Sequence, residues 1–298
     1  MENIEIRRDK KKPDLFTVLA YLILSVLAIL TLFPFYSVLI LSLTNARTYA
    51  AHSPYMLPYA VDFSAFREIF NDPYFRRAVS VTLFNTVVGT TLNMILSVLT
   101  AYALSRRRLA GRNLFTGLVL LTMLFSGGMV PIYVTVKNYG LMNRVWAMIL
   151  PCLINSYYVL IMKNYFMTLP DSLEEAAKMD GANDFHVLTR IFLPVSQPIM
   201  ATFTLFYAVE RWNEWWNAYL YIFKKDLKPL QIYLRDLLAA YNTELAPQLQ
   251  AMMENQHSSF PMAVHMAAIL LAMLPIVCVY PFVQKYFVKG IMIGSVKQ

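Results

Sequence analysis

Six long apolar stretches dominate this sequence, and each can cross the hydrocarbon core of a bilayer, which takes roughly 20 helical residues. They cover approximately Leu15–Leu43, Val79–Leu104, Leu114–Val136, Val145–Met167, Pro198–Phe223 and Met262–Val288. Because backbone polar groups in lipid must bond within the chain, these stretches predict helices. Only 15% of the residues are charged, whereas 58% are hydrophobic. The sequence therefore predicts an all-α membrane protein with six transmembrane helices in a single domain over residues 15–288.

The positions of lysine and arginine predict the orientation of these helices. Cations gather before the first stretch and in the loop between the second and the third: Arg7, Arg8, Lys10, Lys11, Lys12, Arg106, Arg107, Arg108 and Arg112. Cytoplasmic loops carry such an excess, so we expect both regions inside. Six spans then return the C-terminus to the cytoplasm, which places residues 1–14, 168–197 and 289–298 inside. The net charge of +8 reflects this bias and gives no indication of nucleic-acid binding.

The loop between the fourth and fifth stretches, the polar loop (residues 168–197), contains a pattern typical of a helix in water. Ser172 and Glu175 have the spacing of a capping box, and Gly181 predicts a left-handed C-terminal cap. Asn183 or Asp184 predicts the start of a second short helix. A helix this short is unstable alone in water. We therefore expect a partner surface or this protein's own inner face to hold it. The alternative is an ordinary amphipathic loop helix on the membrane surface.

The polar loop also carries a longer signature, formed by Glu175-Ala176-Ala177, then Gly181, then Ile191, Leu193 and Pro194. With its spacings of three and nine residues, it resembles the loop signature of permease subunits of type I bacterial ABC importers. The residues Trp212–Asn217 and the tail Gly290–Lys297 are similar to the carbohydrate-importing branch. Phe63–Arg67 departs from the Asn-Tyr pattern usual before the second span.

This resemblance implies a multi-pass subunit in a bacterial plasma membrane, beside a homologous second permease. Two ATPase subunits would bind ATP and Mg, an extracytoplasmic solute-binding protein would deliver an oligosaccharide, and this chain would bind no cofactor and catalyse no reaction. The loop helix would couple to the ATPase, with Glu174 or Glu175 paired to a basic groove residue. The implied coupling residues are Glu174, Glu175, Ala176, Ala177, Asp180, Gly181, Ile191, Leu193 and Pro194.

Polar residues in the fifth stretch are candidates for the substrate pathway. Glu210, Asn213 and Asn217 follow helical spacing and predict one polar face, and aromatic rings with amides suit a sugar. The candidates are Asn85, Asn93, Asn155, Tyr207, Glu210, Trp212, Asn213, Trp216 and Asn217. Two other interpretations remain open: Arg211 and Glu214 can neutralise each other, and tryptophans near a span end are often interfacial anchors.

The third stretch contains Gly127-Gly128 and Pro131, which predict a kink or a break. Residues Phe125–Tyr133 resemble a sub-branch associated with complex or uronate-bearing oligosaccharides, which implies an acidic sugar, such as one derived from alginate or pectin. The alternatives are a permease for another small polar solute and a self-contained secondary transporter, although no clear internal repeat is present. A membrane enzyme would need a catalytic set, and the four histidines lack metal-ligand spacing.

Overall fold

The computed structural model describes residues 15–51, 57, 59, 61–241 and 260–295, and the regular structure in these ranges is helical. Two whole helices, α1 (Leu15–Ser42) and α4 (Pro73–Ser105), are long and apolar enough to cross a membrane. The same holds for residues Pro261–Val279 of α16 (Pro261–Ser295). Three bent helix pairs raise the number of candidate spans to six if each pair is one span. The all-α prediction is confirmed.

The third predicted span is broken where its glycines predicted a break. α5 (Arg112–Leu124) and α6 (Met129–Asn138) are bent by 111°. Gly128 has a φ of 83°, a left-handed conformation that glycine adopts without strain, and it lies directly before α6. The break is therefore confirmed, but the bend directs α6 away from the axis of α5.

The fourth and fifth predicted spans are also interrupted, which the sequence analysis did not predict. α7 (Trp146–Ile149) and the 3-10 turn η1 (Leu150–Cys152) meet α8 (Ser156–Phe166) at 50°. A bend of 88° follows Val195, at the end of the polar loop and just before the fifth predicted span, which begins in α12 (Gln197–Trp212). A further break separates α12 from α13 (Trp216–Tyr221).

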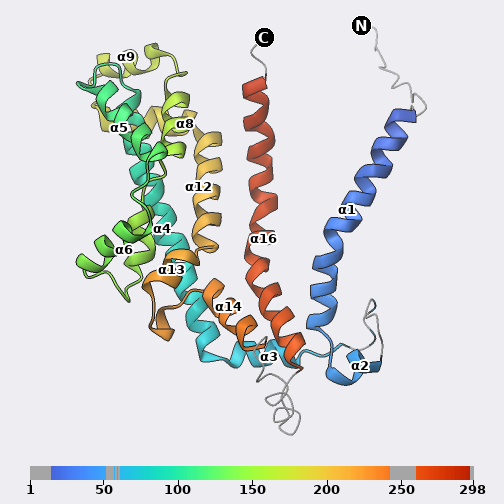
Figure 1. Ribbon diagram of the computed structural model, residues 1–298. Helices are drawn as coiled ribbons and strands as arrows, with labels where there is room; N and C mark the ends of the chain where they lie inside the picture. Colours follow the sequence, from blue (N-terminus) through green and yellow to red (C-terminus); the bar gives the residue numbers. More distant parts are fainter. Residues whose placement is uncertain (1–14, 52–56, 58, 60, 242–259, 296–298) are drawn as a thin grey trace, which may run out of the picture.

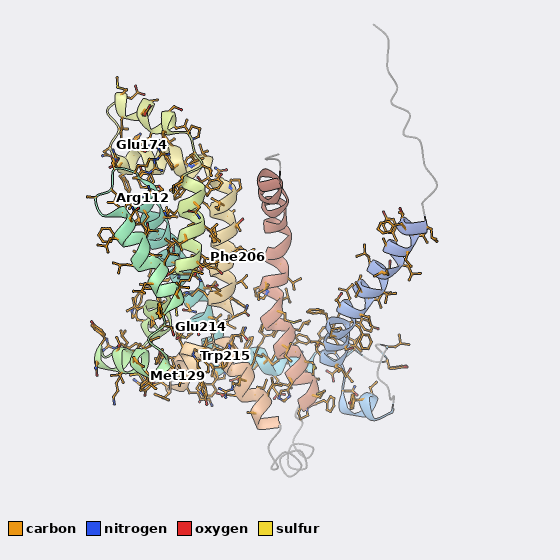
Figure 2. All side chains as sticks on the ribbon, turned by 45° about the horizontal axis from the view of Figure 1, so that its top comes forward. Arg112, Met129, Glu174, Phe206, Glu214 and Trp215 are labelled. Carbon is orange, nitrogen blue, oxygen red and sulfur yellow. The ribbon has the colours of Figure 1, made fainter. Side chains whose placement is uncertain are left out.

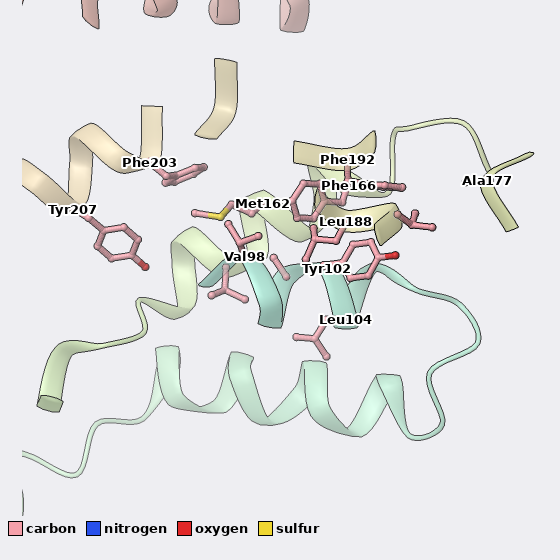
Figure 3. Packing of buried hydrophobic residues seen from close by; sticks show 13 residues of the cluster. Val98, Tyr102, Leu104, Met162, Phe166, Ala177, Leu188, Phe192, Phe203 and Tyr207 are labelled. Atoms are coloured by element: carbon pink, nitrogen blue, oxygen red, sulfur yellow. The ribbon is translucent and has the colours of Figure 1, made fainter. Parts of the chain in front are cut away.

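Figure 1 shows α4, α5, α8 and α12 gathered on one side, with α16 and α1 beside them. The start of α1 and the end of α16 lie at the same end as α9 (Asp171–Met179), which we call the α9 end. A buried cluster joins α4, α8, α12 and the polar loop through Tyr102, Phe166, Phe192 and Tyr207 (Figure 3). Aromatic rings meet edge to face in this cluster, which fixes their packing beyond the burial of apolar area.

The opposite end, the α3 end, carries short helices: α2 (Ala46–Ala51), α3 (Ser64–Asn71), the 3-10 turn η3 (Lys225–Leu227) and α14 (Leu230–Tyr241). Ala65 and Ile69 of α3 are buried against Leu230 of α14 and Ala263 of α16. The described part of the segment between the first two long helices is therefore packed against the rest of the chain.

Helix α1 differs from the other long helices because almost none of it is covered. Its buried residues are Ile40 and Ser42, at the C-terminal end, and its contacts in the described chain are mainly with α16. Val38 and Leu41 are half-buried at the same end, and nearly all of its other apolar side chains are exposed. An apolar helix in this state needs lipid or another subunit around it.

Candidate coupling surface and translocation surface

The polar loop folds into two short helices with the predicted turn between them. α9 ends in a Schellman motif: Gly181 has a φ of 82°, its N–H donates to Lys178 O at 2.9 Å, and the Ala182 N–H donates to Ala177 O at 2.9 Å. Asn183 then caps α10 (Asp184–Val187), since its Oδ1 accepts from the His186 N–H at 2.8 Å. The predicted roles of Gly181 and Asn183 are confirmed.

The predicted capping box at the start of α9 is wrong. The helix begins two residues earlier than a Ser172 cap implies, at Asp171, with Pro170 at the N-cap and no side-chain cap bond. The φ of −59° at this proline suits the entry into a helix, so the first turn forms without the Ser172 hydroxyl.

The inward side of the polar loop packs on the helices of the membrane domain. Ala177 is buried in the cluster of Figure 3, and Ile191 and Leu193 lie half-buried against it. The chain passes through the π-helix η2 (Leu188–Phe192) and α11 (Leu193–Val195), which contains Pro194, and bends at Ser196. The signature residues Ala177, Ile191 and Leu193 therefore hold the loop to its own chain.

Glu174 is also engaged inside the protein. Its carboxylate forms ion pairs with Arg106 and Lys178 and lies 3.4 Å from Arg108, with 14% of its side chain exposed. Arg106 in turn stacks over the rings of Tyr102 and Phe192, at 4.9 and 4.5 Å from their centroids. A part-buried carboxylate with three cations around it is fixed to the end of α4. In this structure Glu174 is not a free group that awaits a basic partner.

The outward side of the polar loop consists of Glu175, Ala176, Asp180, Gly181 and Pro194, all exposed. Two apolar side chains that the sequence analysis missed lie beside them. Met179 is 88% exposed and Phe185 is 69% exposed. Exposed apolar side chains mark a contact with another protein or with the membrane where they form a patch. In the sequence, the only sign of these two residues is that they are apolar residues among charged ones. The signature does not specify the residue type at either position.

A cavity of about 470 Å³ lies between α9 and the end of α4. Arg106, Arg107 and Arg108 line it on one side, and Asp171, Glu174 and Glu175 line it on the other. Figure 2 shows Glu174 at this end of the molecule together with Arg112. The walls carry both signs of charge, which suits charged side chains of a docked protein.

Arg211 is the principal buried charge that the sequence analysis misinterpreted. It is 3% exposed, and no carboxylate in the described chain forms an ion pair with it. Its guanidinium donates to Met148 O at 2.7 Å, to Cys152 O at 2.5 Å and to Asn93 Oδ1 at 3.1 Å. The predicted neutralisation by Glu214 is therefore wrong, because Arg211 instead binds the backbone of the broken fourth span.

Asn85, Asn93 and Tyr207 belong to the same buried network. Asn85 donates to Arg211 O at 2.9 Å, and Asn93 donates to Cys152 O at 2.8 Å. The Tyr207 hydroxyl lies 2.7 Å from Ser97 Oγ and accepts from the Asn155 N–H at 3.3 Å. Non-helical backbone inside a membrane must find partners within the protein. Asn93 and Tyr207 supply them at the break between η1 and α8, and Asn85 supplies one at the end of α12.

The predicted polar face in the fifth span is not continuous, because α12 ends at Trp212. Glu210 is exposed and accepts from the Tyr158 hydroxyl, whereas Asn213 is exposed and accepts from Gln231 Nε2 at 3.3 Å. Asn217 turns back to Glu214, with bonds of 2.9 Å from its backbone N–H and its Nδ2.

The tryptophans of this segment divide into one buried and two exposed residues. Trp212 is buried and donates to Ala272 O of α16 at 3.1 Å. Trp215 and Trp216 are exposed, with ring centroids 5.4 Å apart and nearly perpendicular planes. Figure 2 places Glu214 and Trp215 beyond the end of α12, far from Glu174. No group of His, Cys, Asp and Glu in the described chain could hold a metal ion.

Known proteins share this architecture. The family model "Binding-protein-dependent transport system inner membrane component" matches residues 93–293. Protein LplC of Bacillus subtilis is 40% identical over the full length of both chains. The polygalacturonan/rhamnogalacturonan transport system permease protein YtcP of Bacillus subtilis is also 40% identical, covering 96% of this chain and 99% of that protein.

Solved structures agree with the sequence relatives. A chain of a bacterial ABC transporter involved in the import of the acidic polysaccharide alginate matches with a TM-score of 0.84 at 32% identity, covering 91% of this chain and 96% of that chain. A chain of a bacterial alginate ABC transporter, in complex with an alginate pentasaccharide-bound periplasmic protein, matches at 15% identity with a TM-score of 0.51 and shares the fold. The chain belongs to the binding-protein-dependent transport system inner membrane components, a family of transport permeases.

Proposed function

We propose that this protein is one of two permease subunits of an ATP-driven importer and that it passes an acidic oligosaccharide through a plasma membrane. In this proposal the α9 end is cytoplasmic, six spans cross the bilayer, and both chain termini are inside. One observation carries the proposal: the polar loop has two different sides. One side is fixed to its own chain, and the other exposes Glu175, Met179 and Phe185.

The exposed side of the loop would seat in a groove of an ATPase subunit, which binds ATP and Mg. Glu175 would pair with a cation of the groove, with Met179 and Phe185 in apolar contact. The same contact would be lined by Ala176, Asp180, Gly181 and Pro194. The movement of the ATPase would pass to α4, α8 and α12 through the residues on the other side of the loop, which are Glu174, Ala177, Ile191 and Leu193. A second permease subunit would cover the exposed faces that lipid does not.

The translocation surface would include Asn155, Glu210, Asn213, Trp216 and Asn217. Of these, Glu210 and Asn213 are exposed at the end of α12, and Trp216 is exposed beside Trp215, so amide and aromatic groups are available to a sugar. Asn85, Asn93, Tyr207 and Trp212 would form the wall behind this surface, because they are buried and bonded within the chain.

An acidic sugar is supported by the names of two relatives, a polygalacturonan/rhamnogalacturonan permease and an alginate importer. Exposed cations at the α3 end, among them Lys137, Arg144 and Lys224, would favour the approach of an anion or of an acidic solute-binding protein.

The test uses the whole importer in liposomes, with its solute-binding protein and ATP. Glu175→Gln should weaken sugar-stimulated ATP hydrolysis and the retention of the ATPase subunit during purification. The matched variant Glu174→Gln should leave the retention of the ATPase subunit unchanged and should lower the thermal stability of the permease, because it removes an internal ion pair. Uptake of oligogalacturonate should exceed that of a neutral oligosaccharide of equal length. Transport by this chain without an ATPase would contradict the proposal.

A further inference from the structure

The inner end of the seam between α5 and α8 holds polar groups that have no partner. Lys163 of α8 is 9% exposed and forms no ion pair among the described residues. The hydroxyl of Thr116 in α5 is buried without a hydrogen bond. A buried charge or hydroxyl left unpaired costs free energy, so such groups in a native structure call for a partner.

The register of the two helices places these groups opposite one another. The Thr122 hydroxyl lies 2.8 Å from Ser156 Oγ, and Arg112 Nη2 lies 3.3 Å from Met167 Sδ, so α5 and α8 run antiparallel. In an antiparallel pair, residues that lie opposite each other have numbers with a nearly constant sum. Thr116 and Lys163 have nearly the same sum as these two pairs, so they lie opposite each other. Thr116 faces the seam one helical turn after Arg112, because Arg112, Thr116 and Val119 form the less exposed stripe of α5. Lys163 lies opposite Thr116 on α8.

The charge at this position is positive and uncompensated. Arg112 is the charged neighbour that acts on Lys163, and it is also a cation. Apart from its contact with Met167 Sδ, the guanidinium of Arg112 donates to a carbonyl oxygen, Leu104 O at 3.0 Å. α5 begins here with Gly111 at the N-cap and no side-chain cap, so its first N–H groups add positive potential. Two cations, a hydroxyl and a helix N-terminus together suit an anion.

The approach to this site is apolar. Leu114, Phe115 and Leu118 on the outer side of α5 are all exposed, next to the Arg112–Thr116 stripe. A soluble anion would have to pass this surface, whereas a phospholipid lies along it with its headgroup at the helix end. Basic pockets between helices on the cytoplasmic side are a recurrent way to bind such headgroups.

We propose that Lys163, Arg112 and Thr116 form a binding site for the phosphate of an anionic phospholipid of the inner leaflet. The site rests on the topology proposed above, in which the α9 end is cytoplasmic, but not on the identity of the sugar. The headgroup supplies the negative charge that the two cations lack, and its acyl chains cover the exposed face of α5.

The test measures phosphatidylglycerol retained by the purified importer complex in native mass spectrometry, after exchange from nanodiscs that contain equal phosphatidylglycerol and phosphatidylcholine. The wild type should retain phosphatidylglycerol in preference. Lys163→Met should lower this retention about fivefold, the effect of one cation near the membrane surface. Lys137→Met makes the same change at the exposed end of α6, in the predicted outer region, and should leave retention unchanged.

Thr116→Val keeps the size of the side chain and removes only the hydroxyl, so it tests the site without altering charge. It should also lower retention of phosphatidylglycerol. Equal retention by the wild type and Lys163→Met would overturn the proposal, as would equal retention of phosphatidylcholine. Displacement of the lipid by millimolar inorganic phosphate would show a site for soluble anions and would overturn the lipid assignment. Sugar uptake is not part of the readout, so a wrong substrate leaves this result unaffected.

Discussion

Nη1 of Arg211 in α12 lies 2.7 Å from the carbonyl oxygen of Met148, in the short helix before the break of the fourth span. Through this bond and those to Cys152 O and Asn93, one side chain ties together α4, α12 and the interrupted span. Arginine suits this position because its guanidinium stays charged and offers several donors in a plane. An interruption that would be costly in lipid is thereby stabilised from within.

Arg211→Gln should destabilise the protein, because it leaves buried carbonyl oxygens without donors. Hydrogen bonds to charged groups contribute about 1.5–3 kcal/mol, which corresponds to a fall in melting temperature of roughly 2–5 °C for a protein of this size. Arg76→Gln, at an exposed arginine in the first turn of α4, should shift the melting temperature by less than about 1 °C. The melting temperatures of both variants can be measured by a thermal-shift assay in detergent. Equal shifts for Arg211→Gln and Arg76→Gln would contradict the hydrogen bonds of Arg211.

Gly89 should tolerate no larger residue, because a Cβ there would lie 2.9 Å from Cδ of Arg211. Gly89→Ala should therefore destabilise by about 1–3 kcal/mol. The control is Gly117→Ala in α5, where a Cβ meets nothing within 4 Å and helix propensity should add about 0.5–1 kcal/mol.

A double-mutant cycle makes the Gly89 prediction specific. In an Arg211→Ala background, Gly89→Ala should lose its effect on the free energy of unfolding, since the clashing atoms are gone. If the two effects instead add, the strain at Gly89 comes from another source.

Gly181→Val should weaken coupling between ATP hydrolysis and transport. The φ of 82° penalises a β-branched residue by about 1–2 kcal/mol, although its Cβ would meet no atom within 4 Å. Gly181→Asn should be nearly neutral, because asparagine tolerates this conformation. The measurement is ATP hydrolysed per sugar transported.

Gly140, which follows α6, provides a matched control for Gly181. It has a φ of 64° and equally open surroundings, so Gly140→Val introduces the same kind of strain far from the polar loop. It should lower stability and leave coupling intact. A loss of coupling in both variants would show a general effect of backbone strain.

The contact between Tyr233 of α14 and Asp72 predicts a pH effect at the α3 end. The Tyr233 hydroxyl donates to Asp72 Oδ2 at 2.8 Å, and burial together with this carboxylate raises the pKa of Tyr233 above its usual value. The folded state thus holds the proton more tightly than the unfolded state, whose tyrosine titrates near pH 10. The stabilisation is complete below about pH 10 and is lost as the pH rises toward the pKa of the folded state.

Tyr233→Phe should remove this alkaline loss and cost about 1 kcal/mol at neutral pH. Melting temperatures of wild type and variant, measured from pH 7 to pH 11, should converge at the alkaline end. Parallel curves over the whole range would show that Tyr233 does not titrate in the way its surroundings imply.

Local patterns predicted the features that depend on neighbours in sequence. Apolar runs gave the helical stretches, Gly127-Gly128 the break before α6, and Gly181 and Asn183 the turn in the polar loop. Each depends on hydropathy or on backbone preference within a few residues. The start of α9 was not predicted correctly, because Pro170 sets the first turn without a side-chain cap.

Features that depend on distant residues could not be predicted. Arg211 contacts Asn93, 118 positions away, and Glu174 contacts Arg106, 68 positions away. Residue spacing alone favoured the nearby partner Glu214 for Arg211, and an outside partner for Glu174. The folded chain instead supplies backbone carbonyls for Arg211 and internal cations for Glu174, which nothing in the local pattern indicates.

The position of α1 against α16 has a consequence for biosynthesis. α1 is the first of these helices to leave the ribosome, and α16 is the last. At 5–20 residues per second, the roughly 220 residues between the two contacting ends take about 10–45 s to synthesise. Throughout that interval α1 lacks its main partner in the chain. Its insertion must therefore depend on its own hydropathy, and this contact closes only when translation is nearly complete.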